Sequence, residues 1–354
     1  MTKKAIITGA SGLIGSQCVE FYSEKGFDVI GIDNDMRSYF FGPEASTLPV
    51  KDSLESKHKN YKCYNVDIRD YKSLEPIFQS GEISTVIHTA AQPSHDWAAN
   101  EPLTDYSVNA MGTVNLLELY RLNAPDATFI FTSTNKVYGD RPNYLNLSEL
   151  ETRYEYYDAS GELGSISEDM SIDDCKHSLF GASKVSADIM VQEYGKYFGL
   201  NTAVFRGGCL TGPNHKGAEL HGFLSYLIKC IVHDKPYTVF GYKGKQVRDN
   251  IHSWDLVNMF WNYHNNPSPG EVYNAGGGRS NSVSMVEAIE KTKAMIGSEW
   301  DKYTISDKNR IGDHMWYITD FSKFERHYPN WSITHSIDSI FEQIVEHELR
   351  VKND

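Results

Sequence analysis

The stretch most suggestive of chemistry is HSLFGASKVSAD, residues 177–188, in which Phe180 precedes Lys184 by four residues. Residues four apart lie on one face of a helix. A tyrosine at the first position would have its phenol pKa lowered by the lysine ammonium and could then accept a proton. Phe180 has no oxygen and cannot transfer a proton. The stretch therefore predicts a proton-transfer site that needs another base.

His95, in QPSHD, is the leading candidate for that base, because an unperturbed imidazole titrates near pH 6.5. It follows the expected strand 85–88. A residue just after this strand would lie beside a substrate bound at the carboxyl end of a parallel sheet. The alternative is an ordinary hydrogen-bonded loop histidine. The weaker candidates are Tyr154, Tyr156, Tyr157, His177 and Cys209.

Short apolar segments alternate with amphipathic helices along the first two thirds of the chain, which predicts an α/β fold with a doubly wound parallel sheet. The expected strands are 5–8, 28–32, 64–66, 85–88, 128–131 and 202–205, and the first expected helix ends at Lys25. The pattern becomes irregular from about Gly207, which indicates a smaller second lobe. We expect a first domain of 1–206 plus about 250–278, and a second of about 207–249 plus 279–354.

Two long polar inserts interrupt this alternation, at residues 36–60 and 143–176. Loops of this length in a compact domain often serve as lids or ligand loops. The first contains SYFFG and the second YEYY, so each could place aromatic side chains over a ligand. Packing of each loop on itself is an equally good explanation.

The segment TGASGLIG places Gly9, Gly12 and Gly15 between the first strand and the first helix. These glycines permit a tight turn and close approach of a pyrophosphate to the helix N-terminus. Asp33 follows the second strand, where a carboxylate accepts both ribose hydroxyls of NAD and repels a 2′-phosphate. The pattern predicts a Rossmann fold that binds NAD, although Arg37 lies near enough to leave NADP open.

Further cofactor contacts are expected where later strands end. Asp67 lies where an adenine contact belongs, small residues follow His88, and Asn109 is expected to open a helix. The complete set of expected cofactor residues is Gly9, Ser11, Gly12, Leu13, Ile14, Gly15, Asp33, Asn34, Asp67, Ile68, Ala90, Ala91, Gln92, Asn109, Thr132, Lys184 and Arg206.

Composition narrows the range of partners. A formal charge of −13 and a pI near 5.5 disfavour nucleic acid and anionic membranes, which reward a basic surface. Five scattered cysteines form no CxxC pair, so we expect reduced thiols and no metal site. The four-residue apolar segment near the N-terminus is too short for a secretory signal, and we expect a cytoplasmic protein.

With these motifs the chain resembles the extended short-chain dehydrogenase/reductases that modify nucleotide sugars. The shared segments are TGASGLIG, NVDIRD, HTAAQ, VNAMGTVNLLE, TSTNKVYGD, FGASK, FRGGCLTGP and GKQVRDNIHSWD. Within that family it is most similar to the CDP-tyvelose (CDP-paratose) 2-epimerases. The resemblance implies a retained NAD, a CDP-hexose substrate, and a hydride that leaves and returns at one sugar carbon.

The resemblance also assigns roles in the substrate site. Thr134 would hydrogen-bond a sugar hydroxyl, Lys184 would hold the nicotinamide ribose, and two arginines would clamp the diphosphate through bidentate bonds. The expected substrate-binding residues are Gln92, His95, Asn135, Lys136, Arg248 and Arg310. Related 4,6-dehydratases follow the threonine with an Asp-Glu pair. Asn135 and Lys136 cannot replace that acid and base near neutral pH, which disfavours 4,6-dehydration.

Three explanations of Phe180 stay open: a relocated base such as His95, a phenylalanine introduced by design to trap substrate, or a non-catalytic protein that binds NAD and a nucleotide sugar. A dehydrogenase or an unusual dehydratase of the same substrates is a further alternative. By family analogy, MGTVNLLELYRL and SKVSADIMVQEYG would pair two subunits into a homodimer. Their apolar spacing fits plain core packing nearly as well.

Overall fold

The structure is a computed structural model that describes residues 3–212, 222–308 and 312–353. The chain divides into two compact units, each of which is built from three separate segments. The first unit consists of Met1–Val137, Leu179–Arg206 and Val257–Tyr273, and the second of Tyr138–Ser178, Gly207–Leu256 and Asn274–Asp354.

This division differs from the expected domains in three places, residues 138–178, 250–256 and 274–278, all of which belong to the second unit. Residues 138–178 belong to the second unit, because the backbone N–H of Tyr154 donates to the carbonyl of Lys245 and Arg153 pairs with Glu287. Residues 250–256 also belong there; residues 250–252 complete strand β11 (Val247–His252), and residues 253–256 are the first turn of the helix that follows it. The insert 138–178 therefore contacts residues much later in the chain. The alternation of strands and helices along the sequence does not reveal such distant contacts.

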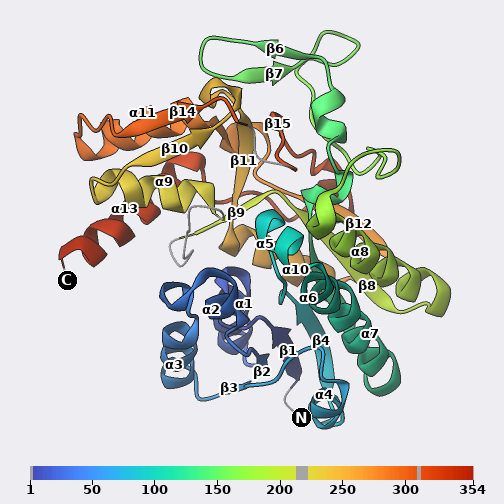
Figure 1. Ribbon diagram of the computed structural model, residues 1–354. Helices are drawn as coiled ribbons and strands as arrows, with labels where there is room; N and C mark the ends of the chain where they lie inside the picture. The colour runs from blue at the N-terminus through green and yellow to red at the C-terminus, as the bar shows by residue number, and fades with distance from the viewer. Residues whose placement is uncertain (1–2, 213–221, 309–311, 354) are drawn as a thin grey trace. The chain divides into compact units, whose positions relative to one another are not determined.

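The first unit contains a seven-stranded sheet in the order β12-β8-β5-β4-β1-β2-β3 (Figure 1). Its pairs from β3 to β5 are all parallel. Its elements are β1 (Lys4–Thr8), α1 (Leu13–Glu24), β2 (Asp28–Ile32), α2 (Met36–Phe41), α3 (Leu48–Lys57), β3 (Tyr61–Tyr64), α4 (Tyr71–Phe78), β4 (Ile83–His88), α5 (His95–Asn100), α6 (Pro102–Tyr106), α7 (Gly112–Asn123), β5 (Thr128–Thr134), α8 (Ser178–Phe198), β8 (Asn201–Gly207), α10 (Ser253–Asn265) and β12 (Glu271–Ala275). The doubly wound parallel sheet predicted from the sequence is confirmed.

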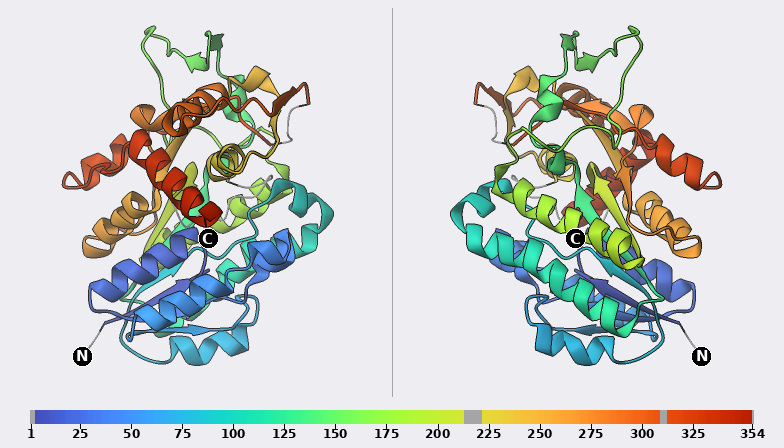
Figure 2. Two further views of the ribbon diagram at one scale, coloured as in Figure 1. Left: turned by 90° about the vertical axis from the view of Figure 1, so that its left-hand side faces the viewer. Right: turned by 90° about the vertical axis from the view of Figure 1, so that its right-hand side faces the viewer.

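Helices cover both faces of this sheet, as the two views of Figure 2 show for α1 and α3 on one face and α7 and α8 on the other. On the second face, buried side chains of α4, α7 and α8 pack on apolar residues of the strands, including Ile6, Val86 and Phe129. On the first face, α1 contacts α10 through aromatic rings, with Tyr22 and Trp261 at a centroid distance of 5.7 Å. The strands are therefore buried on both sides, as parallel strands require.

The first insert, residues 36–60, is helical, where we expected a long loop. Its turn after β2 is held by Asp35, whose carboxylate accepts from the backbone N–H of Thr47 at 2.7 Å and from Ser46 Oγ at 2.8 Å. Aromatic residues of α2 pack on α5, with the Phe40 and Trp97 rings 4.6 Å apart. The SYFFG aromatics thus have a packing partner within the first unit.

The second unit is built from small sheets and three long helices. Strand β11 pairs with β9, β13 and β15, β10 pairs with β14, and β6 and β7 form a hairpin. Its elements are β6 (Leu147–Glu149), β7 (Tyr154–Tyr156), β9 (Cys209–Thr211), α9 (Phe223–Val232), β10 (Tyr237–Phe240), β11 (Val247–His252), β13 (Ser282–Ser284), α11 (Met285–Ile296), β14 (Tyr303–Ser306), β15 (Trp316–Tyr317), α12 (Ser322–His327) and α13 (Ile337–Asn353). Apolar faces of α9, α11 and α13 form its core.

The second insert is fixed to this unit by charge pairs. Glu155 on β7 is 4% exposed and accepts from Arg279 at 2.8 Å and from the indole N–H of Trp316 at 3.1 Å. Arg153 forms two bonds to Glu287, the carboxylate of the capping box that starts α11. The hairpin is therefore docked on α11 and β15. Among the described residues, no helix is long and apolar enough to span a membrane.

Candidate active site

The glycine-rich turn between β1 and α1 has the geometry of an anion site. Gly9 adopts φ +64°, and a Cβ there would lie 2.8 Å from the backbone nitrogen of Ala90. A Cβ on Gly15 would lie 2.0 Å from the carbonyl oxygen of Gly9. Helix α1 begins after Gly12 with no side chain capping it, so the first N–H groups remain for a ligand such as a pyrophosphate.

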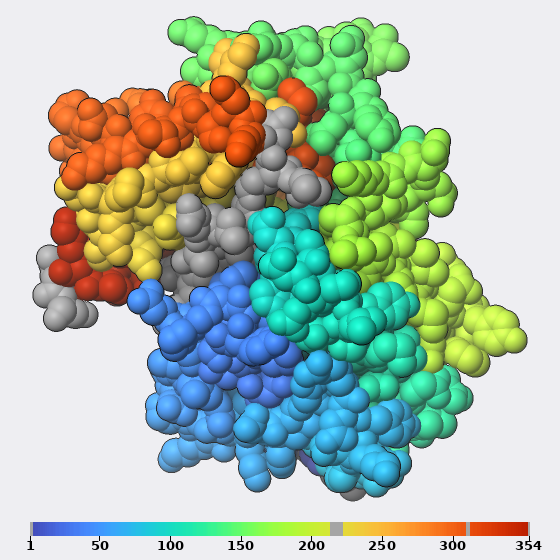
Figure 3. Space-filling view, viewed as in Figure 1, coloured from blue at the N-terminus to red at the C-terminus, as the bar shows by residue number. Residues whose placement is uncertain are grey.

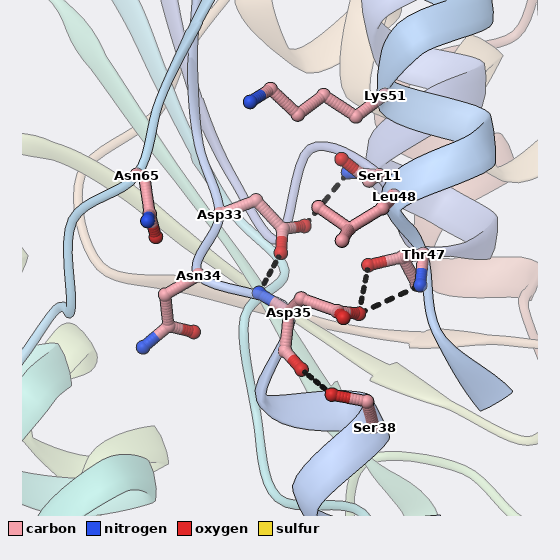
Figure 4. A pocket seen from close by; sticks show the side chains of 9 residues that line it. All are labelled: Ser11, Asp33, Asn34, Asp35, Ser38, Thr47, Leu48, Lys51 and Asn65. Atoms are coloured by element: carbon pink, nitrogen blue, oxygen red, sulfur yellow. Dashed lines mark hydrogen bonds between the residues drawn. The ribbon is translucent and has the colours of Figure 1, made fainter. Parts of the chain in front are cut away.

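Beside this turn, a hollow of about 270 Å³ opens next to Asp33 (Figure 4). The carboxylate of Asp33 accepts from the backbone N–H of Ser11 and of Asp35, each at 2.9 Å. Burial raises the pKa of Asp33, and these two N–H bonds oppose that rise. The residues lining the hollow are Ser11, Asp33, Asn34, Asp35, Ser38, Thr47, Leu48, Lys51 and Asn65.

Sequence reasoning found Ser11, Asp33 and Asn34 in this lining and missed the others. Asp35 adopts φ +55° and directs its carboxylate to the start of α3, which brings Lys51 to the edge of the hollow. The helical folding of the insert places Ser38, Thr47, Leu48 and Lys51 here, whereas Asn65 follows β3. Arg37, which left NADP open, has its guanidinium 5.0 Å from the ring centroid of Phe41.

Asp67 and Ile68 follow β3. Both oxygens of Asp67 accept from the Arg69 guanidinium, at 2.9 and 2.6 Å, and Asn34 Nδ2 donates to the same carboxylate at 3.0 Å. These bonds hold the pKa of Asp67 below its usual value, with burial opposing them. Ile68 is buried, and a Cβ on Gly112 would lie 2.6 Å from its side chain.

At the end of β5, Lys184 Nζ donates to the carbonyl of Thr132 at 3.0 Å and lies 4.1 Å from the Phe131 ring centroid. Burial lowers the pKa of Lys184 to about 7, against the opposing charges of Asp188 and Asp105. Thr132 Oγ1 and Ser11 Oγ are two of the buried side-chain oxygens of the described residues that have no hydrogen-bond partner. Unpaired buried hydroxyls require a polar partner, so this region suits a hydroxyl-rich cofactor such as NAD.

Arg206, expected among the cofactor residues, forms a buried ion pair within the protein. It is 5% exposed, and its guanidinium makes two bonds to Asp188, at 3.0 and 2.9 Å. Asp188 also accepts from Ser133 Oγ at 2.7 Å. A buried carboxylate needs a buried cation, and Arg206 provides it for Asp188.

Gln92 and Asn109 are likewise bonded to protein groups. The Gln92 backbone N–H donates to Asn109 Oδ1 at 2.9 Å, and Asn109 Nδ2 donates back to the Gln92 carbonyl at 3.0 Å. Asn109 was expected to open a helix, but it lies inside a π-helical turn, Ser107–Met111. Both residues were expected among the cofactor residues, and their side chains have partners within the protein.

His95 lies against Phe180, with ring centroids 5.0 Å apart and ring planes at 74°. Phe180 is 6% exposed on α8, one turn before Lys184, and His95 is half-buried at the start of α5. The structure therefore brings together the residue in the tyrosine position, the lysine that follows it and the candidate base.

Thr134 ends β5, and its hydroxyl accepts the backbone N–H of Lys136 at 3.2 Å. Asn135 between them is buried. This short turn keeps the Thr134 side chain at the carboxyl end of a strand, where ligands of parallel sheets bind.

In the second unit, Arg248 on β11 is 9% exposed and forms an ion pair with Asp313 at 2.5 Å. It also donates to the carbonyls of Val247 and His314. A guanidinium held in this way presents a fixed cation. Arg310 lies outside the described residues. The weaker base candidates Tyr154, Tyr156, Tyr157, His177 and Cys209 also belong to the second unit.

Comparisons with known proteins agree with this geometry. Residues 5–276 match the model of the NAD dependent epimerase/dehydratase family. The chain belongs to that family. It is 32% identical to CDP-paratose 2-epimerase of Salmonella typhi over 296 residues, which cover 81% of this chain and 82% of the relative. It is 28% identical to UDP-glucuronate 4-epimerase of Thermodesulfobacterium geofontis, over 83% of this chain and 81% of that one.

Among solved structures, the chain superposes on UDP-glucuronic acid 4-epimerase from Bacillus cereus, bound to UDP-glucuronic acid and NAD. The TM-score is 0.78 at 25% identity, covering 98% of this chain and 99% of the other. The NAD complex of dTDP-glucose 4,6-dehydratase from Bacillus anthracis gives a TM-score of 0.78 at 21% identity over 99% and 98%. The resemblance to nucleotide-sugar enzymes is confirmed, and the cofactor of the family is NAD.

Proposed function

We propose that this protein epimerises a nucleotide-linked hexose, at C2 of a CDP-sugar, with NAD as a retained cofactor. Membership of the epimerase/dehydratase family supports the reaction class. The 32% identity to a CDP-paratose 2-epimerase supports the nucleotide and the carbon. Asn135 and Lys136 disfavour dehydration, because neither can protonate a leaving hydroxyl and abstract a carbon-bound proton near pH 7.

Bound NAD would supply the hydride acceptor and donor. The glycine turn at Gly9, Gly12 and Gly15 would hold its pyrophosphate, Asp33 its adenosine ribose, and Lys184 its nicotinamide ribose. Thr134 would hydrogen-bond the sugar hydroxyl. His95 would take the hydroxyl proton while the carbon is oxidised to a ketone, and would return that proton when the carbon is reduced from its other face.

The observation that carries the chemistry is the contact of His95 with Phe180 at 5.0 Å between ring centroids. It places an imidazole beside the ring that replaces the usual phenol. A site that had lost proton transfer would have no need of a titratable group there. Arg248 is proposed to bind the diphosphate, and Arg310 is proposed for the same role from the sequence alone.

Proton NMR of the purified protein with CDP-, UDP- and GDP-hexoses, without added cofactor, tests the proposal. New anomeric signals from a CDP-hexose are expected, and their couplings identify the inverted carbon. His95→Gln should reduce kcat at least tenfold, in the range of general-base catalysis. Phe180→Leu is the matched control, because it removes the ring and leaves the imidazole.

Three other results would overturn parts of the proposal. If one of the nucleotide hexoses binds but the NMR spectra of all of them stay unchanged, the protein is non-catalytic. Net formation of NADH would indicate a dehydrogenase. A His95→Gln enzyme with full activity would exclude His95 as the base.

We further propose a homodimer. Apolar and aromatic side chains are exposed along α7 and α8, which lie side by side in the first unit (Figure 3, teal and yellow-green). They include Leu122 at 58% exposure, Leu179 at 50% and Ile189 at 41%. Light scattering should give twice the chain mass of 40.1 kDa, and Ile189→Glu should shift it to the monomer. The five free thiols favour the cytoplasm as the compartment.

A further inference from the structure

Asp105 is a buried carboxylate in the first unit that neither the cofactor nor the substrate assignment uses. It lies on α6 and is 1% exposed. Its Oδ1 accepts from Gln92 Nε2 at 2.7 Å and from Asn109 Nδ2 at 3.0 Å. One oxygen atom therefore joins the segment after β4 to the π-helical turn.

The Gln92 side of this network fixes the start of α5. Gln92 Oε1 accepts the backbone N–H of Ser94 at 2.6 Å, and Gln92 Nε2 donates to the Ser94 carbonyl at 2.9 Å. Ser94 is the N-cap of α5, and its Oγ accepts the backbone N–H of Trp97. Because α5 begins at His95, these bonds hold the backbone from which the imidazole projects.

The Asn109 side fixes α8. Asn109 Nδ2 also donates to Ser183 Oγ at 3.1 Å, and Ser183 Oγ donates to the carbonyl of Phe180 at 3.0 Å. The two ends of the network thus hold the two rings that contact each other, that of His95 and that of Phe180.

The Asp105 network is polar although it is buried, and stability alone does not explain this. A buried carboxylate costs free energy unless donors compensate it, and burial raises the pKa of Asp105. Apolar residues of similar volume often give equal or greater stability. Buried networks with all their bonds made do give rigidity, and π-helical turns occur frequently at functional sites. Both features favour precise placement of the site over stability as the role.

We propose that Asp105 is a positioning residue, which holds the Gln92–His95 turn so that the imidazole of His95 lies against Phe180. This inference rests on the proposed function, in which His95 is the proton acceptor. Asp105 touches neither the ring nor the reacting atoms, so it acts through Gln92, Ser94 and Asn109.

Two substitutions of Asp105 distinguish the effect of its hydrogen-bond acceptor from the effect of its negative charge. Asp105→Asn keeps an oxygen that can accept from Gln92 and Asn109, whereas Asp105→Leu removes every acceptor. Histidine-labelled protein, with the His95 signals assigned by His95→Gln, reports the ring environment and its titration. We expect Asp105→Asn to keep the His95 shifts and at least one third of kcat at the optimum pH. Asp105→Leu should change the shifts and titration and reduce kcat at least tenfold, with KM within about threefold.

Gln92→Met provides a second route if Asp105→Leu does not fold, because it breaks the bonds to both Asp105 and Ser94. It should change the His95 signals in the same way. Asp70→Asn, an exposed N-cap aspartate of α4, is the control and should alter neither readout. Unchanged His95 signals in both Asp105→Leu and Gln92→Met would overturn the inference, as would equal losses in Asp105→Asn and Asp105→Leu. The NMR measurement of His95 needs no substrate. It therefore tests whether Asp105 positions His95 even if the protein epimerises no sugar.

Discussion

Replacing Lys184 by methionine should stabilise the cofactor-free protein while it removes a cofactor contact. Lys184 is 3% exposed, and burial lowers its pKa from the ordinary 10.5 to about 7. A change of that size corresponds to about 5 kcal/mol of preference for the neutral amine. This is the upper bound of what the ammonium costs the folded state.

The sign follows from the two pKa values. Below pH 7 the amine is protonated in both the folded and the unfolded chain, so the full cost is present. Between pH 7 and about 10.5 the unfolded chain binds one proton more, and stability rises with pH. The rise should approach about 1.4 kcal/mol per pH unit, and Lys184→Met should lack it.

Urea unfolding of cofactor-free protein, followed by circular dichroism from pH 6 to 9.5, measures this difference. The free energy of unfolding of Lys184→Met should exceed that of the wild type most at pH 6. This difference in stability should become steadily smaller above pH 7.5. Lys57→Met is the control, because Lys57 is largely exposed beside Glu20 and its pKa is raised. Parallel pH profiles for the wild type and Lys184→Met would refute the reasoning.

Three further substitutions test the framework. Gly9→Ala should lose bound NAD in a chromatographic assay of released nucleotide, because the added Cβ meets backbone at 2.8 Å and φ is +64°. Arg206→Met should lower the free energy of unfolding by about 3–5 kcal/mol in urea, because it leaves the Asp188 carboxylate buried without a cation. Glu287→Gln should speed limited proteolysis of the β6–β7 hairpin severalfold, because it removes the anion that Arg153 contacts.

Each of these has a matched control in the same chain. Gly26 also has positive φ, at +82°, but a Cβ there has nothing within 4 Å, so Gly26→Ala should keep NAD. Arg121 pairs with Glu118 at the surface, and Arg121→Met should cost under about 1 kcal/mol. Glu290→Gln alters an exposed pair on α11 and should leave hairpin cleavage unchanged. A control that behaves like its test variant would contradict the corresponding explanation.

The sheet and the phosphate turn were predictable because their signals are local. Apolar segments of strand length alternate with helices, and Gly9 and Gly15 occur where a Cβ would meet backbone atoms under 3.0 Å away. Gly15 illustrates this, since its missing Cβ leaves room for the carbonyl of Gly9. Such constraints act over a few residues and can be read from a single sequence.

The hydrogen-bond partners of polar side chains were not predictable, because these partners lie far away in the sequence. Arg206 has the residue type of a phosphate ligand, but its Nε and Nη2 donate to the Asp188 carboxylate on α8. Gln92 was expected to face a ligand, and Asp105, thirteen residues later, binds its amide. The second insert joins the second unit for the same reason, since Glu287 lies far along the chain from Arg153.

The replacement of tyrosine by Phe180 is best explained together with the network that surrounds it. A phenylalanine alone would suit a relocated base, a residue introduced by design to trap substrate, or a lost activity. The Asp105 network, however, fixes both the helix that carries Phe180 and the turn that carries His95. A protein that only bound ligands would need the lysine and the glycine turn, but it would gain nothing from an imidazole held against that ring. The burial of a compensated carboxylate for this purpose therefore favours a working proton acceptor at His95.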